Sequence, residues 1–196
     1  MKTLIYSFEK FHNLKSNPAY DVSKEITEKF NSKEVKLVQL PVTFDCWDIL
    51  ETELNSFKPD FILGIGVAMG GIRVRLEKIG LNYKHADILD NKGVKFTLEK
   101  INPKEKLAYE TEVDVLKFSE SLKSKGIPNE ISFCAGTYIC NYAYYNCLHY
   151  VNNKKIKTLF LHVPSSPKEA IELNLNISVF PTALIANALY EILKTM

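Results

Sequence analysis

The sequence predicts an α/β protein in which helices cover both faces of a central sheet. Short apolar runs typical of buried strands alternate along the chain with amphipathic stretches typical of helices. Such alternation is characteristic of a three-layer α/β/α sandwich. The chain has 196 residues, 46% of them hydrophobic and 24% charged, which is enough for a substantial core. Because no repeat or change of composition divides it, we expect residues 1–196 to form a single domain.

The expected strands are short runs rich in β-branched and other apolar residues, bounded by turn-forming residues or proline. One further segment alternates apolar and polar residues, which also favours a strand. The expected strands span residues 3–7, 35–40, 60–66, 73–82, 130–133 and 158–163.

The expected helices are marked by apolar residues at helical spacing and by residues typical of helix ends. Val22, Ile26 and Phe30 follow Asp21, a plausible N-cap. Gly126 ends another helix, and Pro167 suits a first helical turn. These helices span residues 21–30, 44–57, 113–125, 137–151, a stretch from 167, and 181–194. Residues 84–106, which include a turn at 90–93, are expected to be loop or edge hairpin.

Charge and hydropathy narrow the class of protein. The chain carries 25 basic and 23 acidic residues, so it lacks the concentrated positive charge of a nucleic-acid-binding protein. No apolar stretch approaches the roughly 20 residues of a membrane span, and Glu9 interrupts the start before a signal-peptide core can form. We therefore expect a cytoplasmic protein with reduced cysteines and no nucleic-acid or membrane partner.

The spacing of the cysteines gives no indication of a metal site. Cys134, Cys140 and Cys147 are separated by five and six residues, and the four histidines are scattered. Structural zinc sites usually contain tighter pairs of ligands, so we expect no metal. For Cys46, Cys134 and Cys147 we favour a role as small buried hydrophobes.

Three segments place reactive side chains near the expected ends of strands, where ligands bind in this class of fold. Cys140 lies close to the start of a helix, His162 ends a strand, and Glu77 follows a glycine-containing loop. A helix N-terminus stabilises a thiolate, and a neighbouring imidazole can accept and return its proton. A carboxylate can orient that imidazole, which completes the arrangement of a cysteine hydrolase.

The glycines at 64, 66 and 70 do not make a dinucleotide-binding site. Their spacing differs by one residue from Gly-x-Gly-x-x-Gly. A strand-like alternation also follows where the helix of that motif should begin, so no cofactor is expected here.

Together these segments resemble the pyroglutamyl peptidase type I family, also called pyrrolidone carboxyl peptidases. The similarity lies in AGTYICN (135–141), FLHVPSSPKEA (160–170) and LEKIGLN (76–82). The stretch SFEKFHNLKSNP (7–18) is similar to the family's opening Gly-Phe-x-Pro-Phe segment and its Asn-Pro, and LPVTF (40–44) and DNKG (90–93) also match in place. The resemblance covers nearly the whole chain and implies a phosphorylase/hydrolase-like sandwich with a mixed sheet.

The resemblance also implies an activity. Members of the family are cysteine peptidases, of the omega-peptidase class, that remove N-terminal pyroglutamate from peptides without a cofactor. It makes Cys140 the nucleophile, His162 the general base and Glu77 the third member of the triad. It places a substrate pocket for pyroglutamyl peptides at Phe8, Phe11, Asn17, Tyr138 and Ile139.

The sequence departs from the family pattern around the expected site. Val67 stands for a glutamine, Met69 for a glycine, and Gly71 and Asp87 for two arginines, while His12 and Asn13 replace a glycine pair. Negative charge at Asp87 opposes a developing oxyanion. Arg73 or Arg75 is a candidate to replace the missing positive charge.

These departures leave two alternatives to peptidase activity. One is a related amidase acting on another small N-acyl or lactam substrate, and the other is a small-molecule-binding protein that has lost turnover. The resemblance further implies a homodimer or homotetramer. The apolar residues Val94, Phe96 and Leu98, which alternate in an expected exposed hairpin, are consistent with such an interface.

Overall fold

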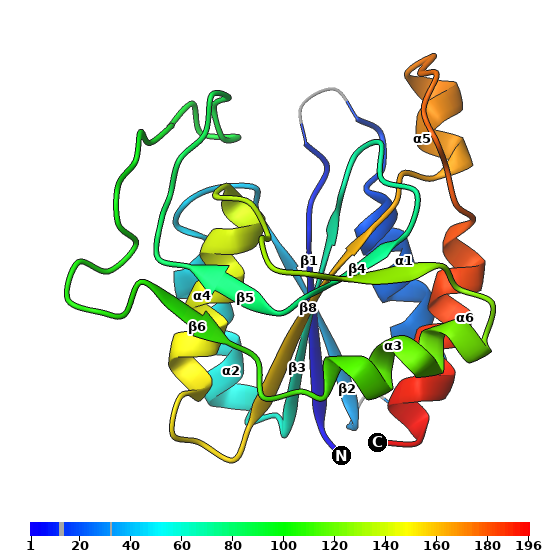
Figure 1. Ribbon diagram of the computed structural model, residues 1–196, viewed down its shortest axis with the longest axis horizontal. Coiled ribbons are helices and arrows are strands. Elements are labelled where there is room, and N and C mark those ends of the chain that lie inside the picture. Colours follow the sequence, from blue (N-terminus) through cyan, green and yellow to red (C-terminus); the bar gives the residue numbers. More distant parts are fainter. Residues whose placement is uncertain (12–13, 32) are drawn as a thin grey trace.

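The computed structural model describes residues 1–11, 14–31 and 33–196. His12 and Asn13, which replace the family's glycine pair, lie outside these described residues. In the described chain a six-stranded sheet has the order β2-β1-β3-β8-β4-β7 (Figure 1), and β5 and β6 form a separate pair. The strands are β1 (Thr3–Phe8), β2 (Val35–Leu40), β3 (Phe61–Val67), β4 (Val74–Glu77), β5 (Ile79–Leu81), β6 (Ala108–Glu110), β7 (Asn129–Ser132) and β8 (Lys157–Val163).

The large sheet is mixed. Strands β2, β1, β3 and β8 run parallel to one another, whereas β4 pairs antiparallel to β8 and parallel to β7. The expected α/β fold with a mixed sheet is confirmed.

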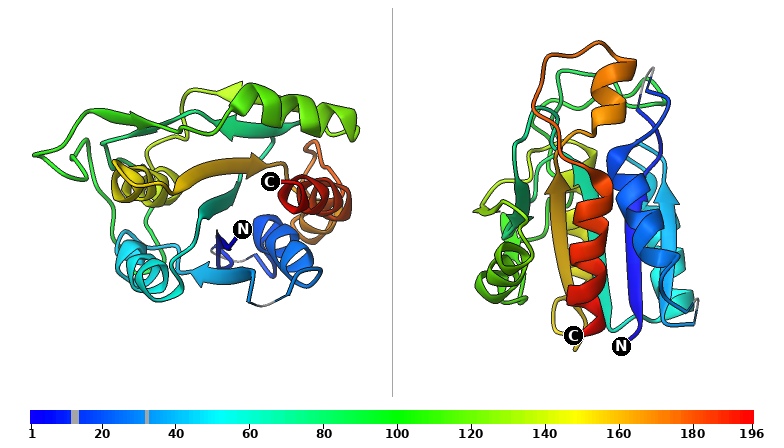
Figure 2. Two further views of the ribbon diagram at one scale, coloured as in Figure 1. Left: turned by 90° about the horizontal axis from the view of Figure 1, so that it is seen from below. Right: turned by 90° about the vertical axis from the view of Figure 1, so that its right-hand side faces the viewer.

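Helices cover both faces of the sheet, as the two views of Figure 2 show. Helices α1, α3 and α6 lie on one face, and α2 and α4 lie on the other. The helices are α1 (Pro18–Thr27), α2 (Cys46–Phe57), α3 (Val115–Ser124), α4 (Ile139–Val151), α5 (Pro167–Glu172) and α6 (Thr182–Lys194).

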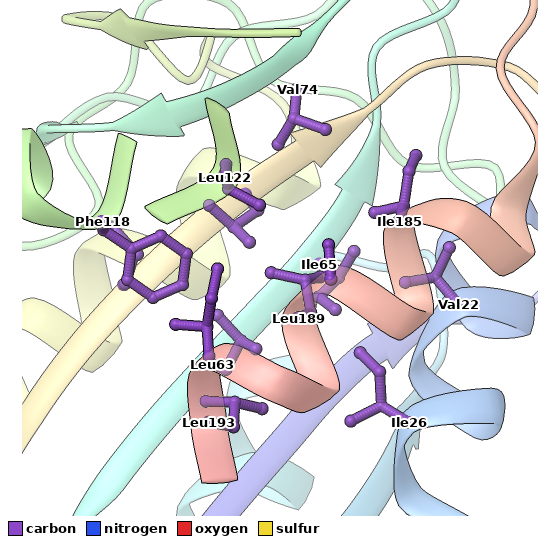
Figure 3. Packing of buried hydrophobic residues seen from close by; sticks show 14 of the residues in the cluster. Val22, Ile26, Leu63, Ile65, Val74, Phe118, Leu122, Ile185, Leu189 and Leu193 are labelled. Atoms are coloured by element: carbon purple, nitrogen blue, oxygen red, sulfur yellow. The ribbon is translucent and has the colours of Figure 1, made fainter. Parts of the chain in front are cut away.

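The two faces bury cores of different chemistry. The face of α1, α3 and α6 is largely aliphatic, with Ile65, Leu189 and their neighbours packed together (Figure 3). The face of α2 and α4 is rich in aromatic side chains, among them the fully buried Tyr6, Tyr144 and Phe160. The alternation of each strand assigns successive side chains to opposite cores.

Helix α1 begins earlier than the sequence predicts. Asn17 is its N-cap, and its side-chain oxygen accepts a hydrogen bond from Ala19 N at 3.0 Å, while Pro18 occupies the first turn. Asp21, the expected cap, lies inside the first turn instead. Proline suits a first turn because its missing N–H would have no helical partner there. The expected end of α3 at Gly126 is confirmed, with a φ of 75° that glycine adopts without strain.

The expected strand at 73–82 is divided between two sheets. Lys78 separates β4 from β5, and its backbone N–H donates to Ser132 O on one side while its C=O accepts from Thr111 N on the other. β5 then pairs antiparallel with β6, a strand of three residues that the sequence analysis did not identify. The alternating pattern indicated extended structure correctly, but it carried no information about a change of partner.

Residues 84–106 form a loop at the end of the sheet where β1, β3 and β8 finish (Figure 1). The expected turn at 90–93 is present, since Gly93 N donates to Asp90 O at 3.0 Å. The expected hairpin is reduced to one bridge between Lys84 and Glu99. Phe96 is not exposed as expected, because its ring packs edge-on against Phe44 at a centroid distance of 4.9 Å.

Candidate active site

Cys140 is the second residue of α4, at the helix end that faces the same edge of the sheet as the loop 84–106 (Figure 1). The first helical hydrogen bond of this segment runs from Tyr142 N to Tyr138 O at 2.9 Å. The amides of Ile139, Cys140 and Asn141 therefore have no carbonyl partner within the helix. Unpaired amides at a helix start favour a thiolate and an oxyanion close to them.

Asn141 fixes this helix end to the neighbouring strand β5. Its side-chain oxygen accepts from Leu81 N at 2.8 Å, and its amide nitrogen donates to Leu81 O at 2.8 Å and to Tyr83 O at 3.0 Å. Asn141 is fully buried, so solvent does not compete for these bonds. The position of Cys140 is thus set by the residue that follows it.

His162 and Glu77 lie on the same face of the sheet as α4. His162 Nδ1 is 2.7 Å from Glu77 Oε1, and the two residues are 7% and 0% exposed. Strands β8 and β4 are antiparallel here, with His162 opposite Arg75 and Phe160 opposite Glu77. Glu77 therefore reaches its partner along the diagonal of the strand pair.

Glu77 is the last residue of β4, so it lies at the end of a strand, as expected. Because β4 runs antiparallel to β8, Glu77 is level with Phe160 and lies further from the carboxyl end of β8 than His162 does. Its other oxygen, Oε2, has no hydrogen-bond partner among the described residues.

Two glycines of β3 make room for the thiol and for the aromatic core beneath it. A Cβ atom at Gly66 would lie 2.8 Å from Cys140 Sγ and 2.9 Å from the Phe160 ring. At Gly64 it would collide with the rings of Phe160 and Tyr6. The alternating glycines therefore have a packing role, which the sequence analysis did not assign when it rejected a dinucleotide-binding motif.

The pKa of His162 is raised by its two partners. Burial lowers the pKa of this imidazole, but hydrogen bonds with Cys140 and Glu77 and the negative charge of both groups outweigh burial and raise the pKa from 6.5 to about 9. The imidazole is therefore held in its protonated form near neutral pH, beside the thiol of Cys140.

The remaining cysteines divide differently from expectation. Cys46 and Cys147 are completely buried, as expected. Cys134 is exposed, and the prediction of a buried small hydrophobe is wrong for it because it lies in the loop between β7 and α4. All four cysteines are free.

A cavity of about 260 Å³ opens beside Cys140. Its lining includes all five residues that the resemblance assigned to the substrate pocket: Phe8, Phe11, Asn17, Tyr138 and Ile139. Aliphatic side chains complete the walls, namely Leu14, Pro18, Val42, Val67, Met69 and Ile88, and Glu169 of α5 also lines the cavity. The sequence analysis did not single out Glu169, although it lies within the quoted segment 160–170.

The polar groups of Asn17 and Tyr138 are already paired with backbone. Asn17 Nδ2 donates to Phe8 O and to Glu9 O, each at 3.0 Å, so that Asn17 ties the end of β1 to the start of α1. Tyr138 OH donates to Leu89 O at 3.0 Å. Both residues therefore shape the cavity, and neither offers a free polar side-chain group to a ligand.

The residues that depart from the family pattern differ in their relation to this site. Val67 and Met69 line the cavity. Arg73 and Arg75 both pair with Glu130, with distances of 3.7 Å and 3.1 Å. Asp87 is exposed on a segment fixed to the start of α4 through Thr137, which exchanges hydrogen bonds with His85.

Among the described residues, no group of three or more His, Cys, Asp or Glu side chains is arranged to hold a metal ion. None of the helices in the described chain has both the length and the apolar character needed to cross a bilayer.

An α/β sandwich with a buried Glu–His pair beside a thiol at a helix start has the construction of a cysteine hydrolase. The family model described as pyroglutamyl peptidase matches residues 1–191. The chain belongs to this family of cysteine peptidases.

Individual relatives agree with the family assignment. The pyrrolidone-carboxylate peptidase of Pyrococcus furiosus is 35% identical over 176 residues, which cover 88% of this chain and 85% of that protein. The structure of a mutant pyrrolidone carboxyl peptidase from the same organism has a TM-score of 0.91 at 30% identity, covering 99% of this chain and 97% of its own. Pyroglutamyl peptidase I from Bacillus amyloliquefaciens has a TM-score of 0.88 at 26% identity, covering 96% and 90%.

These comparisons confirm the resemblance, the fold class and the class of enzyme. The expected function, removal of N-terminal pyroglutamate by a cysteine peptidase, is confirmed at the level of the family. The alternatives of a different amidase and of a binding protein without turnover are not favoured.

The raised pKa of His162 predicts the alkaline limb of activity. Since a protonated imidazole is needed to donate a proton to the leaving amine, kcat/KM for a pyroglutamyl amide should fall above about pH 9. Glu77→Gln should move this limb to lower pH, because the carboxylate charge that helps to raise the pKa is lost. The measurement is kcat/KM from pH 6 to 10.5 for both proteins.

The same shift has a defined effect on stability. The pKa of His162 in the folded protein, about 9, exceeds the unfolded value of 6.5, so its contribution to stability is complete below about pH 6.5 and is lost as the pH rises through 9.

The activity profile has an outcome that would contradict the pairing of His162 with Glu77. This outcome is an alkaline limb of wild-type kcat/KM centred near pH 6.5, or a limb that Glu77→Gln leaves at the same pH.

Proposed function

We propose that this chain hydrolyses the amide bond that follows an N-terminal pyroglutamyl residue, with Cys140 as nucleophile, His162 as general base and acid, and Glu77 as the residue that orients the imidazole. The observation that carries the proposal is the meeting of these three side chains beside one largely apolar cavity. Family membership supports the same assignment.

The reaction follows from the positions of these groups. His162 takes the proton of the Cys140 thiol, and Cys140 Sγ bonds to the pyroglutamyl carbonyl carbon. The carbonyl π electrons move to the oxygen, and the amides at the start of α4 stabilise the resulting oxyanion. His162 transfers its proton to the leaving amine nitrogen as the C–N bond breaks, which leaves a thioester on Cys140. His162 then takes a proton from water, the hydroxide displaces sulfur from the carbonyl carbon, and free pyroglutamate leaves.

The cavity suits a small uncharged ring. Phe11 and Tyr138 lie edge to face, with their ring centroids 5.9 Å apart, and Phe8 and Ile139 contribute further apolar surface. A pyroglutamyl ring has two apolar faces and lacks the ammonium group of an ordinary N-terminus. Such walls therefore favour the lactam over a charged terminus.

The cellular setting and the extent of the functional unit are part of the proposal. The four free cysteines, including the exposed Cys134, suit the reducing environment of a cytoplasm. Helices α1, α2, α3, α4 and α6 bury their apolar sides on the two faces of the one large sheet, which supports residues 1–196 acting as a single domain.

The assignment of the nucleophile predicts a sharp difference between two cysteines. Cys140→Ala should lower kcat for a pyroglutamyl chromogenic amide by roughly a thousandfold or more, because no other group replaces the thiol. Cys134→Ala should keep wild-type activity, since Cys134 is exposed in a loop. Iodoacetamide at pH 6 should label Cys140 stoichiometrically, with peptide mass spectrometry locating the label. Full activity in Cys140→Ala would reject the assignment.

The charge at position 87 predicts a gain of activity. Asp87→Arg should raise kcat/KM for the same amide, because it removes a negative charge and adds a positive one on the segment attached to the start of α4. Lys84→Arg, which conserves charge nearby, is the control. A fall of activity in a folded Asp87→Arg protein would show that Asp87 belongs to a different substrate site.

We also propose that the chain self-associates through the loop 86–107. Exposed apolar side chains gather there: Ile88, Leu89, Val94, Leu98 and Leu107. Sedimentation at micromolar concentration should give a mass above the 22.4 kDa of one chain, and Leu98→Asp should lower it. A wild-type species of 22.4 kDa would reject this interface.

A further inference from the structure

The cavity beside Cys140 contains a buried carboxyl group whose polar atoms are unused. Glu169 of α5 lines the cavity and is only 1% exposed. Neither Oε1 nor Oε2 has a hydrogen-bond partner among the described residues. Burying a carboxyl group in apolar surroundings without a partner is costly, so buried groups of this kind are usually paired.

A local structural role does not account for this side chain. Ser166 and Glu169 have the spacing of a capping box, in which the serine accepts from the backbone of the glutamate and the glutamate accepts from the backbone of the serine. Only the first half is formed, since Glu169 N donates to Ser166 Oγ at 3.1 Å. The return bond from Ser166 N to the Glu169 carboxylate is absent.

The other polar side chains of the cavity are already engaged. Asn17 bonds three backbone groups, and Tyr138 donates to Leu89 O. Cys140 is paired with His162. Glu169 therefore carries the free side-chain hydrogen-bonding capacity among the described residues that line this cavity.

We propose that Glu169 is a specificity-determining residue that accepts a hydrogen bond from the ring N–H of the bound pyroglutamyl residue. The ring has one donor, its lactam N–H, and one further acceptor, its carbonyl oxygen. A carboxylate oxygen is the complementary acceptor for that donor. This inference rests on the proposed function, and it explains why a carboxyl group is retained within apolar walls.

Ring compounds that differ in this one donor test the inference without requiring turnover. The measurement is protection of Cys140 from alkylation by iodoacetamide, titrated with 2-pyrrolidone, cyclopentanone and N-methyl-2-pyrrolidone. Cyclopentanone keeps the ring size without the N–H, and the N-methyl compound keeps the amide. Because a ring without the N–H leaves the buried carboxyl group unpaired, 2-pyrrolidone should bind wild type more tightly than either compound, by roughly 10-fold or more.

Variants assign that preference to the carboxyl group. Glu169→Leu should reduce the preference to within about threefold, because it keeps bulk and removes the acceptor. Glu169→Gln keeps an acceptor oxygen and should retain most of the preference. Glu172→Leu, at an exposed position of the same helix, is the matched control and should behave as wild type.

Several results would overturn the inference. If wild type binds 2-pyrrolidone no better than cyclopentanone, the inference is wrong, and this result does not depend on whether the variants fold. An unchanged preference in Glu169→Leu, or tighter binding of pyrrolidine than of 2-pyrrolidone, would also reject recognition of the lactam N–H. Failure of the proposed function would give a different result from failure of this inference. If the proposed function is wrong, wild type does not hydrolyse any pyroglutamyl amide, whichever ring compound it binds most tightly.

Discussion

The hydrogen bond between His162 and Glu77 is the constraint around which the face of the sheet that α2 and α4 cover is organised. It joins two antiparallel strands in the aromatic core, where Glu77 is fully buried and His162 is 7% exposed. In that setting a charge needs a partner, so the carboxylate and the imidazole hold each other in place. The thiol of Cys140 completes the arrangement from the opposite side, and the imidazole between the two groups has its pKa raised accordingly.

The packing around this pair explains otherwise unremarked features of the sequence. Gly66 leaves space for the thiol, and Gly64 leaves space for the rings that support His162. Phe160 lies edge-on to the His162 ring, with 5.0 Å between the centroids. Asn141 uses its whole amide group to hold the start of α4. The site is thus built on strands and a helix end, and loops contribute mainly to the cavity walls.

The substrate cavity combines a shape set by apolar side chains with a small number of polar groups. Most of those polar groups form hydrogen bonds with the backbone. These bonds hold the cavity walls in place but leave the polar groups little capacity to form hydrogen bonds with a ligand. Glu169 is the exception, because neither of its carboxyl oxygens has a partner among the described residues. Relative to the family pattern, the chain has Cys140, His162 and Glu77 at the positions proposed for a triad and an acidic Asp87 where the pattern has an arginine.

The sequence by itself determined the alternation of strands and helices, and it singled out Cys140, His162 and Glu77 as candidate reactive residues. Apolar periodicity identifies buried faces. Motifs such as AGTYICN and FLHVP consist of consecutive residues, so they can be identified from the sequence without knowledge of the fold. Only the tertiary structure decided which strands pair with one another and which side chains form ion pairs. The antiparallel pairing of β4 on β8, the departure of β5 toward β6, and the pairing of both Arg73 and Arg75 with Glu130 all depend on contacts between distant segments. The exposure of Cys134 and the isolation of the Glu169 carboxyl group are of the same kind, because burial and hydrogen bonding are properties of the packed chain.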